Sequence, residues 1–220
     1  MTSAIIVAAG SSRRMGFDKL FAPLASQPVI AHSLQTFLDH PGINEVVLVG
    51  SPQNRDQLTA LSHRVRVVDG GAERSDSVWN GLQALSARCE YVAIHDGARP
   101  LIHPESIAAG LRSAREHGAA ALAKPVTDTV KRADAAGRVT GSVDRTGLWA
   151  METPQCFRLA VLRSAWETVR NAGRSFTDEV SILEAAGLPV FLVENPHPNP
   201  KITFPRDLAL AEKLLDRPSP

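Results

Sequence analysis

Cysteine and aromatic side chains are scarce in this sequence of 220 residues. The two cysteines, Cys89 and Cys156, stand far apart and form no C-x-x-C pair. We therefore expect both to be small core residues rather than metal ligands or disulfide partners. One tyrosine and seven phenylalanines, mostly within apolar runs, do not supply the base-stacking side chains of a single-stranded nucleic-acid site.

Neither sign of charge predominates, because 24 basic and 23 acidic residues give a formal net charge of +1. This balance gives no support to a nucleic-acid partner, so any phosphate binding must come from cations placed locally. No apolar run reaches membrane-spanning length, and no basic segment followed by an apolar one opens the chain. We expect a cytoplasmic protein with no membrane partner.

Continuous apolar runs typical of buried strands alternate with amphipathic helical patterns. The expected strands cover 4–9, 45–49, 65–68, 91–95, 119–124 and 190–194, and the expected helices cover 28–38, 53–62, 75–86, 104–116, 158–172, 178–186 and 206–215. The alternation predicts one α/β domain over residues 1–220, a three-layer sandwich with a mostly parallel sheet between helices. Ligands of such sheets bind beyond the carboxyl ends of the strands. The loops expected on that rim start at Gly10, Gly70, Asp96 and Pro125.

Residues 126–150 depart from this alternation. They read as two short polar strands around a turn at 135–137, without an apolar face for the main core. Two interpretations stay open: a surface hairpin, or an arm that packs on a second subunit. An isolated hairpin is marginally stable in water, which favours the arm.

The first expected strand runs into a loop of small and basic residues, Ala9-Gly10-Ser11-Ser12-Arg13-Arg14-Met15-Gly16, with Lys19 just beyond. Small residues let backbone N–H groups approach a polyphosphate, and the cations would neutralise its charge. The spacing fits neither the common ATP-binding loop nor the dinucleotide fingerprint. The loop is therefore either a phosphate or nucleotide site, or an ordinary turn with solvated arginines.

A second site, 68–78, follows an expected strand, holds Gly70-Gly71 and opens a helix. Ser75 or Asp76 would serve as a helix cap in the simpler interpretation. In the functional one, the turn meets a nucleobase or ribose, and Arg74 and Ser77 supply polar contacts.

A third loop begins at Asp96, at the end of an expected central strand. A carboxylate there suits Mg²⁺, which is held by one or two carboxylates and substrate phosphates. A turn or cap role for Asp96 remains the alternative, and we interpret His95 as structural. Lys201, after a run of prolines, is a solvated cation unless its loop reaches the same rim. Residues 177–179 fit a helix N-cap with acidic first-turn residues.

No Ser-His-Asp order and no paired zinc-ligand motif occurs, so the residues favour phosphoryl or nucleotidyl transfer. Taken in order, the motifs resemble those of the sugar-phosphate nucleotidyltransferases, and within them the methylerythritol phosphate cytidylyltransferase family. The resemblance covers nearly the whole chain. Its motifs are Val7–Gly10 with Arg14-Met15 and Lys19, Asp69–Gly71 with Arg74–Val78, His95–Pro100, Pro125–Lys131, Val143–Trp149, Thr153–Gln155, Thr177–Glu179 and Lys201–Thr203.

The resemblance implies that CTP and a polyol phosphate, methylerythritol phosphate, give the CDP-linked alcohol and pyrophosphate. It implies catalytic roles for Arg14, Lys19 and Lys201, with Mg²⁺ held by Asp96. By the same likeness the nucleotide contacts Ala8, Ala9, Gly10, Gly71, Ala72, Arg74 and Ser77, and the acceptor contacts Thr129, Arg145, Thr153 and Arg99. Family members dimerise through the arm, so Thr129 and Arg145 are expected to serve the neighbouring subunit's site.

The sequence also departs from the family pattern. Leu20 stands where glutamine is usual, no proline precedes Lys19, Gly97 stands where alanine is commoner, and 195–200 is unusually rich in proline. We expect no second catalytic domain after residue 220. The alternatives to the main interpretation are a ribitol 5-phosphate cytidylyltransferase and a catalytically silent nucleotide-binding subunit.

Overall fold

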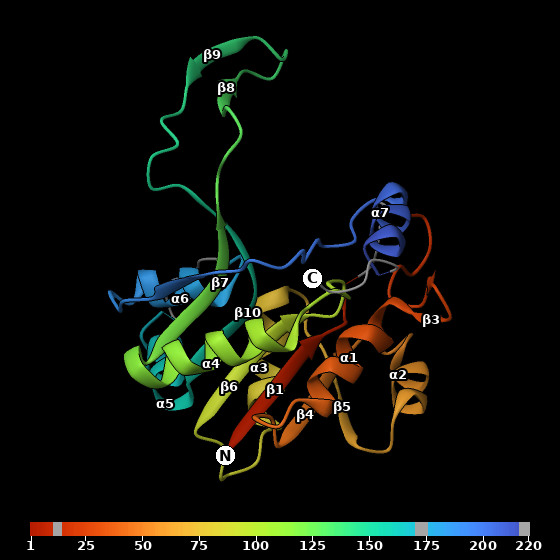
Figure 1. Ribbon diagram of the computed structural model, residues 1–220. Helices are drawn as coiled ribbons and strands as arrows, with labels where there is room; N and C mark the ends of the chain where they lie inside the picture. The colour runs from red at the N-terminus through yellow and green to blue at the C-terminus, as the bar shows by residue number, and fades with distance from the viewer. Residues whose placement is uncertain (11–14, 170–175, 216–220) are drawn as a thin grey trace.

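The computed structural model describes residues 1–10, 15–169 and 176–215. The strands there are β1 (Thr2–Val7), β2 (Pro23–Leu24), β3 (Gln27–Pro28), β4 (Glu45–Gly50), β5 (Val65–Asp69), β6 (Tyr91–Asp96), β7 (Ala119–Pro125), β8 (Lys131–Ala133), β9 (Val139–Ser142), β10 (Trp149–Arg158) and β11 (Phe191–Glu194). The helices are α1 (Val29–Asp39), α2 (Arg55–Leu61), α3 (Arg74–Gln83), α4 (Pro104–His117), α5 (Leu159–Val169), α6 (Glu179–Ala185) and α7 (Pro205–Leu215) (Figure 1).

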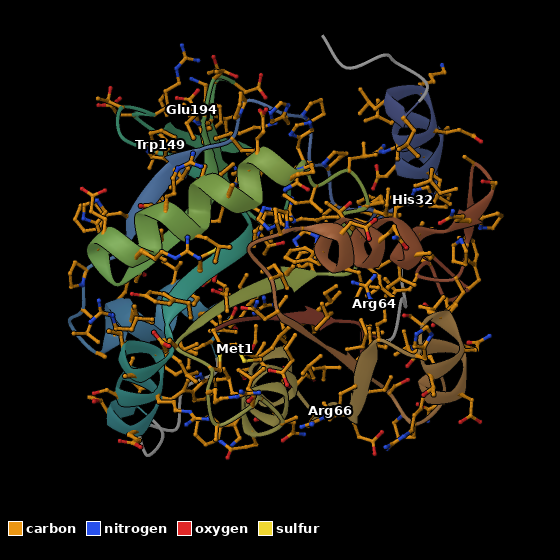
Figure 2. All side chains as sticks on the ribbon, turned by 60° about the horizontal axis from the view of Figure 1, so that its bottom comes forward. Met1, His32, Arg64, Arg66, Trp149 and Glu194 are labelled. Carbon is orange, nitrogen blue, oxygen red and sulfur yellow. The ribbon has the colours of Figure 1, made fainter. Side chains whose placement is uncertain are left out.

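A seven-stranded sheet in the order β11-β7-β10-β6-β1-β4-β5 forms the middle of the molecule. Only β10 runs antiparallel to its neighbours, and the other six strands are parallel to one another. The carboxyl ends of β1, β5, β6 and β7 therefore lie along one edge, as the sequence predicts. In Figure 2, Trp149 at the start of β10 and Glu194 at the end of β11 are labelled near this end of the sheet.

Helices cover both faces of the sheet, which confirms the three-layer α/β architecture (Figure 1). Alternate residues of one strand face opposite layers, since Ile6 packs with α1, α2 and α4, while Ile5 packs with α3, α5 and α6. A third, smaller apolar cluster places α7 beside the loop after β1 and is made of Met15, Leu24, Val29, Ile202 and Ala211. This cluster brings the last described helix to the first rim loop.

The elements predicted from the sequence are present in the described part of the chain, with ends displaced by a few residues. The first strand begins and ends two residues earlier than expected, so Ala8 and Ala9 belong to the rim loop. The expectation for the cysteines is confirmed, because Cys89 and Cys156 are both buried and unbridged. In the three described ranges, no helix is long and apolar enough to cross a membrane.

The antiparallel strand β10 was not predicted. Its sequence mixes polar and apolar residues and contains Pro154, which removes one ladder donor and argues against a central strand. The structure accommodates the proline at a register shift between Met151 and Gln155, where the pairing with β7 is irregular. The pairing of β10 with β6 on one side and with β7 on the other outweighs the weak strand propensity of its sequence.

Within the expected arm at 126–150, the two short strands β8 and β9 pair antiparallel with each other, but the bounds of the arm need correction. Trp149 and Ala150 belong to β10 and pair with Pro125 and Lys124, so the arm covers 126–148. Within the described residues β8 and β9 pair only with each other, and the arm projects from the end of the sheet (Figure 1).

The packing of α3 on the sheet gives a stability prediction. A Cβ at Gly81 would lie 2.9 Å from a methyl carbon of Ile5 and 2.9 Å from one of Val49. Gly81→Ala gains about 1 kcal/mol of helix propensity but incurs overpacking of about 1–3 kcal/mol, so a net loss of about 1 kcal/mol is expected in urea unfolding.

Gly110→Ala in α4 is the matched control, since its close neighbour is one Cys156 sulfur at 3.0 Å. It should lose less stability than Gly81→Ala. A Gly81→Ala protein as stable as the parent would contradict the tight contact between α3, β1 and β4.

Candidate active site

The loops beyond β1, β5 and β6 enclose a cleft of about 530 Å³, the first cavity. Nine residues that the sequence assigned to a nucleotide, metal or catalytic role line it: Ala9, Gly10, Lys19, Gly71, Ala72, Arg74, Ser77, Asp96 and Lys201. Segments from the beginning, middle and end of the chain thus meet on the predicted rim. Arg14, the other predicted catalytic cation, lies outside the described residues.

Ala8 lies behind this lining rather than in it. Ala8 is 1% exposed. Its N–H donates to the Val49 carbonyl at 2.7 Å, and its carbonyl accepts from the Asn54 side-chain amide at 3.0 Å. These bonds fix the start of the loop, so Ala8 supports Ala9 and Gly10 from the core side.

The two glycines after β5 allow the loop to approach its neighbours closely. A Cβ at Gly70 would lie 2.6 Å from the Ala9 Cβ and 2.7 Å from the Ser77 Oγ. The Ser77 hydroxyl accepts from the Gly71 N–H at 3.1 Å and donates to the Glu73 carbonyl at 3.0 Å. Ser77 therefore orders the loop as well as lining the cavity.

The expected cap of α3 is partly wrong. The N-cap residue is Glu73, and the helix begins at Arg74. Asp76 accepts the Glu73 N–H at 3.1 Å as the second half of a capping box, and Ser75 does not cap. This start point brings Arg74 into the first turn of α3, facing the rim.

Asp96, at the end of β6, lies at the centre of a charged group formed with Arg74 and Lys201. Its Oδ2 accepts from the Lys201 Nζ at 2.6 Å, and its Oδ1 accepts from the Arg74 Nε at 3.3 Å. The Arg99 Nε lies 3.8 Å from Oδ2. Burial alone would raise the pKa of Asp96, but Lys201 and Arg74 outweigh it and hold the pKa well below its ordinary value. The carboxylate is therefore ionised at neutral pH.

The positions of Lys201 and Lys19 at the rim both depend on Ile202. The Lys19 Nζ donates to the Ile202 carbonyl at 2.7 Å, and the Ile202 N–H donates to the Ala98 carbonyl at 2.8 Å. The Ile202 side chain is fully buried against α7 and Met15. The alternative of Lys201 as a merely solvated loop cation is thus wrong, because its amine contacts Asp96.

Arg74 is held by a second carboxylate that the sequence analysis did not assign. Its two terminal nitrogens donate to the Glu179 oxygens at 2.8 and 3.1 Å, and Glu179 is fully buried. Burial works to lower the pKa of Arg74, but Glu179 and Asp96 outweigh it and raise the pKa above its ordinary value. The bidentate geometry fixes the guanidinium plane.

The segment at 177–179 therefore has two roles. The expected cap lies one residue too early, because Asp178 rather than Thr177 is the N-cap of α6 and accepts from the Ser181 N–H at 3.0 Å. The next residue, Glu179, turns inward to Arg74, and its N–H donates to the Gln155 side chain at 3.1 Å. The acidic residues of the motif were visible in the sequence, but the cap explained them without a partner.

A second cavity of about 390 Å³ adjoins the first. Arg99 and Thr153, two predicted acceptor contacts, line it, together with residues of β10 and the start of α6. Arg74, Asp96 and Lys201 line both cavities. The charged group therefore stands between two neighbouring cavities.

Thr129 and Arg145, the other predicted acceptor contacts, lie elsewhere. Both are exposed on the arm, and neither lines the two cavities of its own chain. Arg145 donates to the Thr127 carbonyl within the arm.

The proline-rich approach to Lys201 is fixed by a buried polar network on β10. The Glu152 Oε2 accepts from Asn195 at 2.7 Å and from Asn199 at 3.1 Å, and Asn199 also donates to the Thr153 carbonyl at 2.8 Å. The Arg99 guanidinium donates to the Asn199 carbonyl at 2.8 Å. These bonds set where Lys201 leaves the segment.

His95 belongs to a buried hydrogen-bond chain behind Asp96. Its Nε2 faces the Arg99 carbonyl at 3.2 Å, and its Nδ1 lies 3.0 Å from the Thr153 Oγ1, which accepts the Asp96 N–H at 3.1 Å. A carbonyl only accepts, so Nε2 carries the proton and Nδ1 accepts from the Thr153 hydroxyl. Burial lowers the pKa of His95 to about 4. This neutral, fully bonded ring fits the structural interpretation.

Asp96 is the candidate metal ligand, and a metal ion there would replace the Lys201 amine or the Arg74 guanidinium, which now contact its two oxygens. The carboxylate is ionised and lines both cavities. Among the residues described, Glu179 is the other carboxylate in direct contact with Arg74, and that guanidinium already occupies both of its oxygens. A metal here would depend on one protein carboxylate, with phosphate and water oxygens completing its shell.

A mostly parallel α/β sheet with small-residue loops and converging cations at its carboxyl edge defines a protein of the nucleotidyltransferase class. The chain matches the family model of 2-C-methyl-D-erythritol 4-phosphate cytidylyltransferase over residues 2–217 and belongs to that family.

Named relatives and solved structures agree with this assignment. The 2-C-methyl-D-erythritol 4-phosphate cytidylyltransferase of Cereibacter sphaeroides is 44% identical over 97% of this chain and 96% of its own length. The crystal structure of the enzyme so named from Thermus thermophilus superposes with a TM-score of 0.85 at 30% identity, covering 99% of this chain and all of that one. The bifunctional enzyme IspD/IspF of Desulfotalea psychrophila is 42% identical over 97% of this chain, which spans only 56% of that protein.

The buried His95 gives a pH prediction. Its pKa is about 4 in the folded protein and 6.5 ordinarily, so between these values the unfolded chain binds a proton that the native state does not. The free energy of unfolding should fall by roughly 3 kcal/mol through this group as the pH drops from 6.5 to 4.

His95→Gln should flatten this part of the urea-unfolding profile even if it lowers stability throughout. His63→Gln, at an exposed histidine, is the control and should keep the slope. An unchanged slope in His95→Gln would show that other groups produce it.

Proposed function

We propose that the chain transfers the cytidylyl group of CTP to 2-C-methyl-D-erythritol 4-phosphate and releases pyrophosphate, a step of the non-mevalonate isoprenoid pathway in the cytoplasm. The observation that carries the proposal is the position of Arg74, Asp96 and Lys201 between two adjoining cavities. Family membership supports the identity of both substrates.

In the proposed reaction, CTP occupies the first cavity and the acceptor occupies the second. An oxygen of the acceptor phosphate attacks the α-phosphorus in line. A new P–O bond forms while the bond to the leaving pyrophosphate breaks, and pyrophosphate carries away the electron pair. Little covalent chemistry is asked of the protein, so positioning and charge stabilisation carry the catalysis.

The cations of the rim supply that stabilisation. Lys19 and Lys201 line the first cavity, and Arg14 from the neighbouring loop is proposed to join them. Their positive charge faces the region where negative charge grows on the α-phosphate and the leaving group. Ala9, Gly10, Gly71 and Ala72 would leave backbone groups open to the base and ribose, since no large side chain intervenes.

Mg²⁺ is proposed as the cofactor, with Asp96 as its protein ligand. When bound, a magnesium ion would neutralise part of the triphosphate charge. Lys201 and Arg74 keep the Asp96 carboxylate ionised before substrate arrives. Lys201 would then be shared between Asp96 and the phosphates.

We also propose that the arm mediates a homodimer. The arm exposes Val139 at 66% and Leu148 at 38%, and an isolated two-stranded hairpin is marginally stable. Thr129 and Arg145 do not line the cavities of their own chain. In a dimer they would reach the acceptor phosphate in the partner's second cavity.

A substrate-matrix assay tests the function. Pyrophosphate release is measured with each of the four ribonucleoside triphosphates, in combination with methylerythritol phosphate or ribitol 5-phosphate. Turnover only with CTP and methylerythritol phosphate is expected. Faster turnover with ribitol 5-phosphate would favour the alternative acceptor, and no magnesium-dependent release with any pair would favour a silent nucleotide-binding subunit.

Lys19→Ala should lower kcat by about 10²–10³-fold while changing the KM for CTP much less, because its charge meets charge that develops in the transition state. Steady-state kinetics at saturating acceptor measure both constants. Lys213→Ala on the exposed face of α7 is the matched control and should behave as the parent. A rise in KM alone would instead assign Lys19 to ground-state binding.

Arg145→Ala should raise the KM for the acceptor, whereas Arg138→Ala at the same hairpin should not. Mixing Arg145→Ala chains with Lys19→Ala chains should restore part of the activity, since one site of the mixed dimer then has both residues. Recovery is read from activity against mixing ratio after subunit exchange. Absence of recovery in verified mixed dimers would overturn the shared-site arrangement.

A further inference from the structure

A cluster of two histidines and one glutamate lies outside the two cavities. His103 is the N-cap of α4, Glu105 is in its first turn, and His197 comes from the proline-rich segment 195–200. The two imidazole rings stack with centroids 3.8 Å apart at 19°. In the described parts of the chain, this is the one group of three such side chains whose potential ligand atoms all lie within 4.8 Å of one another.

The distances within the cluster are close to those of a coordination sphere. The Glu105 Oε2 lies 3.4 Å from the His197 Nε2 and 3.9 Å from the His103 Nδ1. Ligands bonded to a tetrahedral Zn²⁺ at 2.0–2.1 Å lie about 3.3 Å apart. Because an imidazole lone pair lies in the plane of its ring, a shared ion requires one of the two nearly parallel rings to turn out of the stack. The glutamate side chain is exposed and free to rotate toward the ion.

The chemistry of the donors selects the kind of ion. Two imidazole nitrogens and one carboxylate oxygen suit Zn²⁺ and related transition-metal ions, whereas Mg²⁺ favours oxygen ligands. Burial first, and then the facing His197, lower the pKa of His103, which favours its neutral ring.

Surrounding charges are nearly balanced. The N-terminus of α4 disfavours a cation, and the Glu105 carboxylate in the first turn offsets this. Lys124 donates to the His197 carbonyl at 3.0 Å and also lies 3.7 Å from Glu152.

We propose that His103, Glu105 and His197 bind a transition-metal ion of the Zn²⁺ class, with a fourth position open to water. This site is separate from the magnesium position proposed at Asp96. The His103 Nδ1 now accepts the Glu105 N–H through a long bond of 3.3 Å, which metal binding through that atom would replace.

The consequence concerns the segment that presents Lys201. Asn195 and Asn199 already fasten this segment to Glu152, and His197 lies between them. A metal bond to His197 would tie the middle of the segment to the start of α4. The departure from the family pattern at 195–200 would then stiffen the approach to Lys201.

The test measures Zn²⁺ binding to the full chain by competition with a chromophoric chelator, in millimolar Mg²⁺ to occupy oxygen sites. One Zn²⁺ per chain is expected at micromolar affinity or better. His103→Asn keeps a helix-capping oxygen, and His197→Gln keeps a polar side chain; each should weaken binding at least about tenfold. His63→Gln, at an exposed histidine elsewhere, should bind as the parent.

Hydrogen exchange provides a second readout that does not depend on catalysis. Zn²⁺ should slow exchange of the amides of Asn195, His197, Asn199 and Lys201 in the parent and not in His197→Gln. Equal stoichiometry and affinity in the His103→Asn, His197→Gln double variant would overturn the site, as would failure of the parent to bind. Neither the binding assay nor the exchange experiment uses CTP. A failure of this proposal therefore leaves the proposed transferase activity standing.

Discussion

The rim depends on the burial of one carboxylate. Asp96 is 8% exposed at the end of a central strand, and an ionised group there must be paired. Its partners are Arg74 at the start of α3 and Lys201, more than 100 residues further along the chain. The ion pairs that offset the cost of burying the Asp96 carboxylate therefore also bring Arg74 and Lys201 together. A polyphosphate entering the first cavity would meet charges already in place, with Lys201 exchanging part of its contact with Asp96 for phosphate.

The sheet was predictable because its parallel strands are buried on both faces. Runs such as 45–49 and 119–124 are short and nearly free of polar side chains, as is typical of strands buried on both faces of a parallel sheet. Their order along the chain placed the loops on one rim. β10 was not predictable, because Glu152, Pro154 and Gln155 lie between two neighbouring strands and receive their partners only in the folded state.

The site was predictable to the same extent. The rim rule places the loop that leads to Lys19 beside the loop that begins at Asp96. Lys201 was assigned to the site only by the family resemblance, because nothing in its own segment predicts that it reaches the rim. Glu179 was missed because an N-cap already accounted for its segment, and a helix cap says nothing of which buried cation lies opposite. Glu152 was missed with its strand. Thr129 and Arg145 belong to the arm and line neither cavity, so the fold of one chain does not place them at a site, and their assignment depends on the proposed dimer.

Packing also explains how the chain absorbs its departures from the family pattern near Lys19. Leu20 is 3% exposed within the core cluster of α1 and α4, and its carbonyl accepts the Ile30 N–H at 3.0 Å. The buried Leu20 side chain fixes the loop to the core, while the Lys19 amine donates to the Ile202 carbonyl. Gly97 is equally constrained, since a Cβ would meet the Val7 carbonyl at 3.2 Å and Ile30 at 3.1 Å. A larger residue would require β1 and α1 to separate slightly, so glycine here lets them close behind the rim.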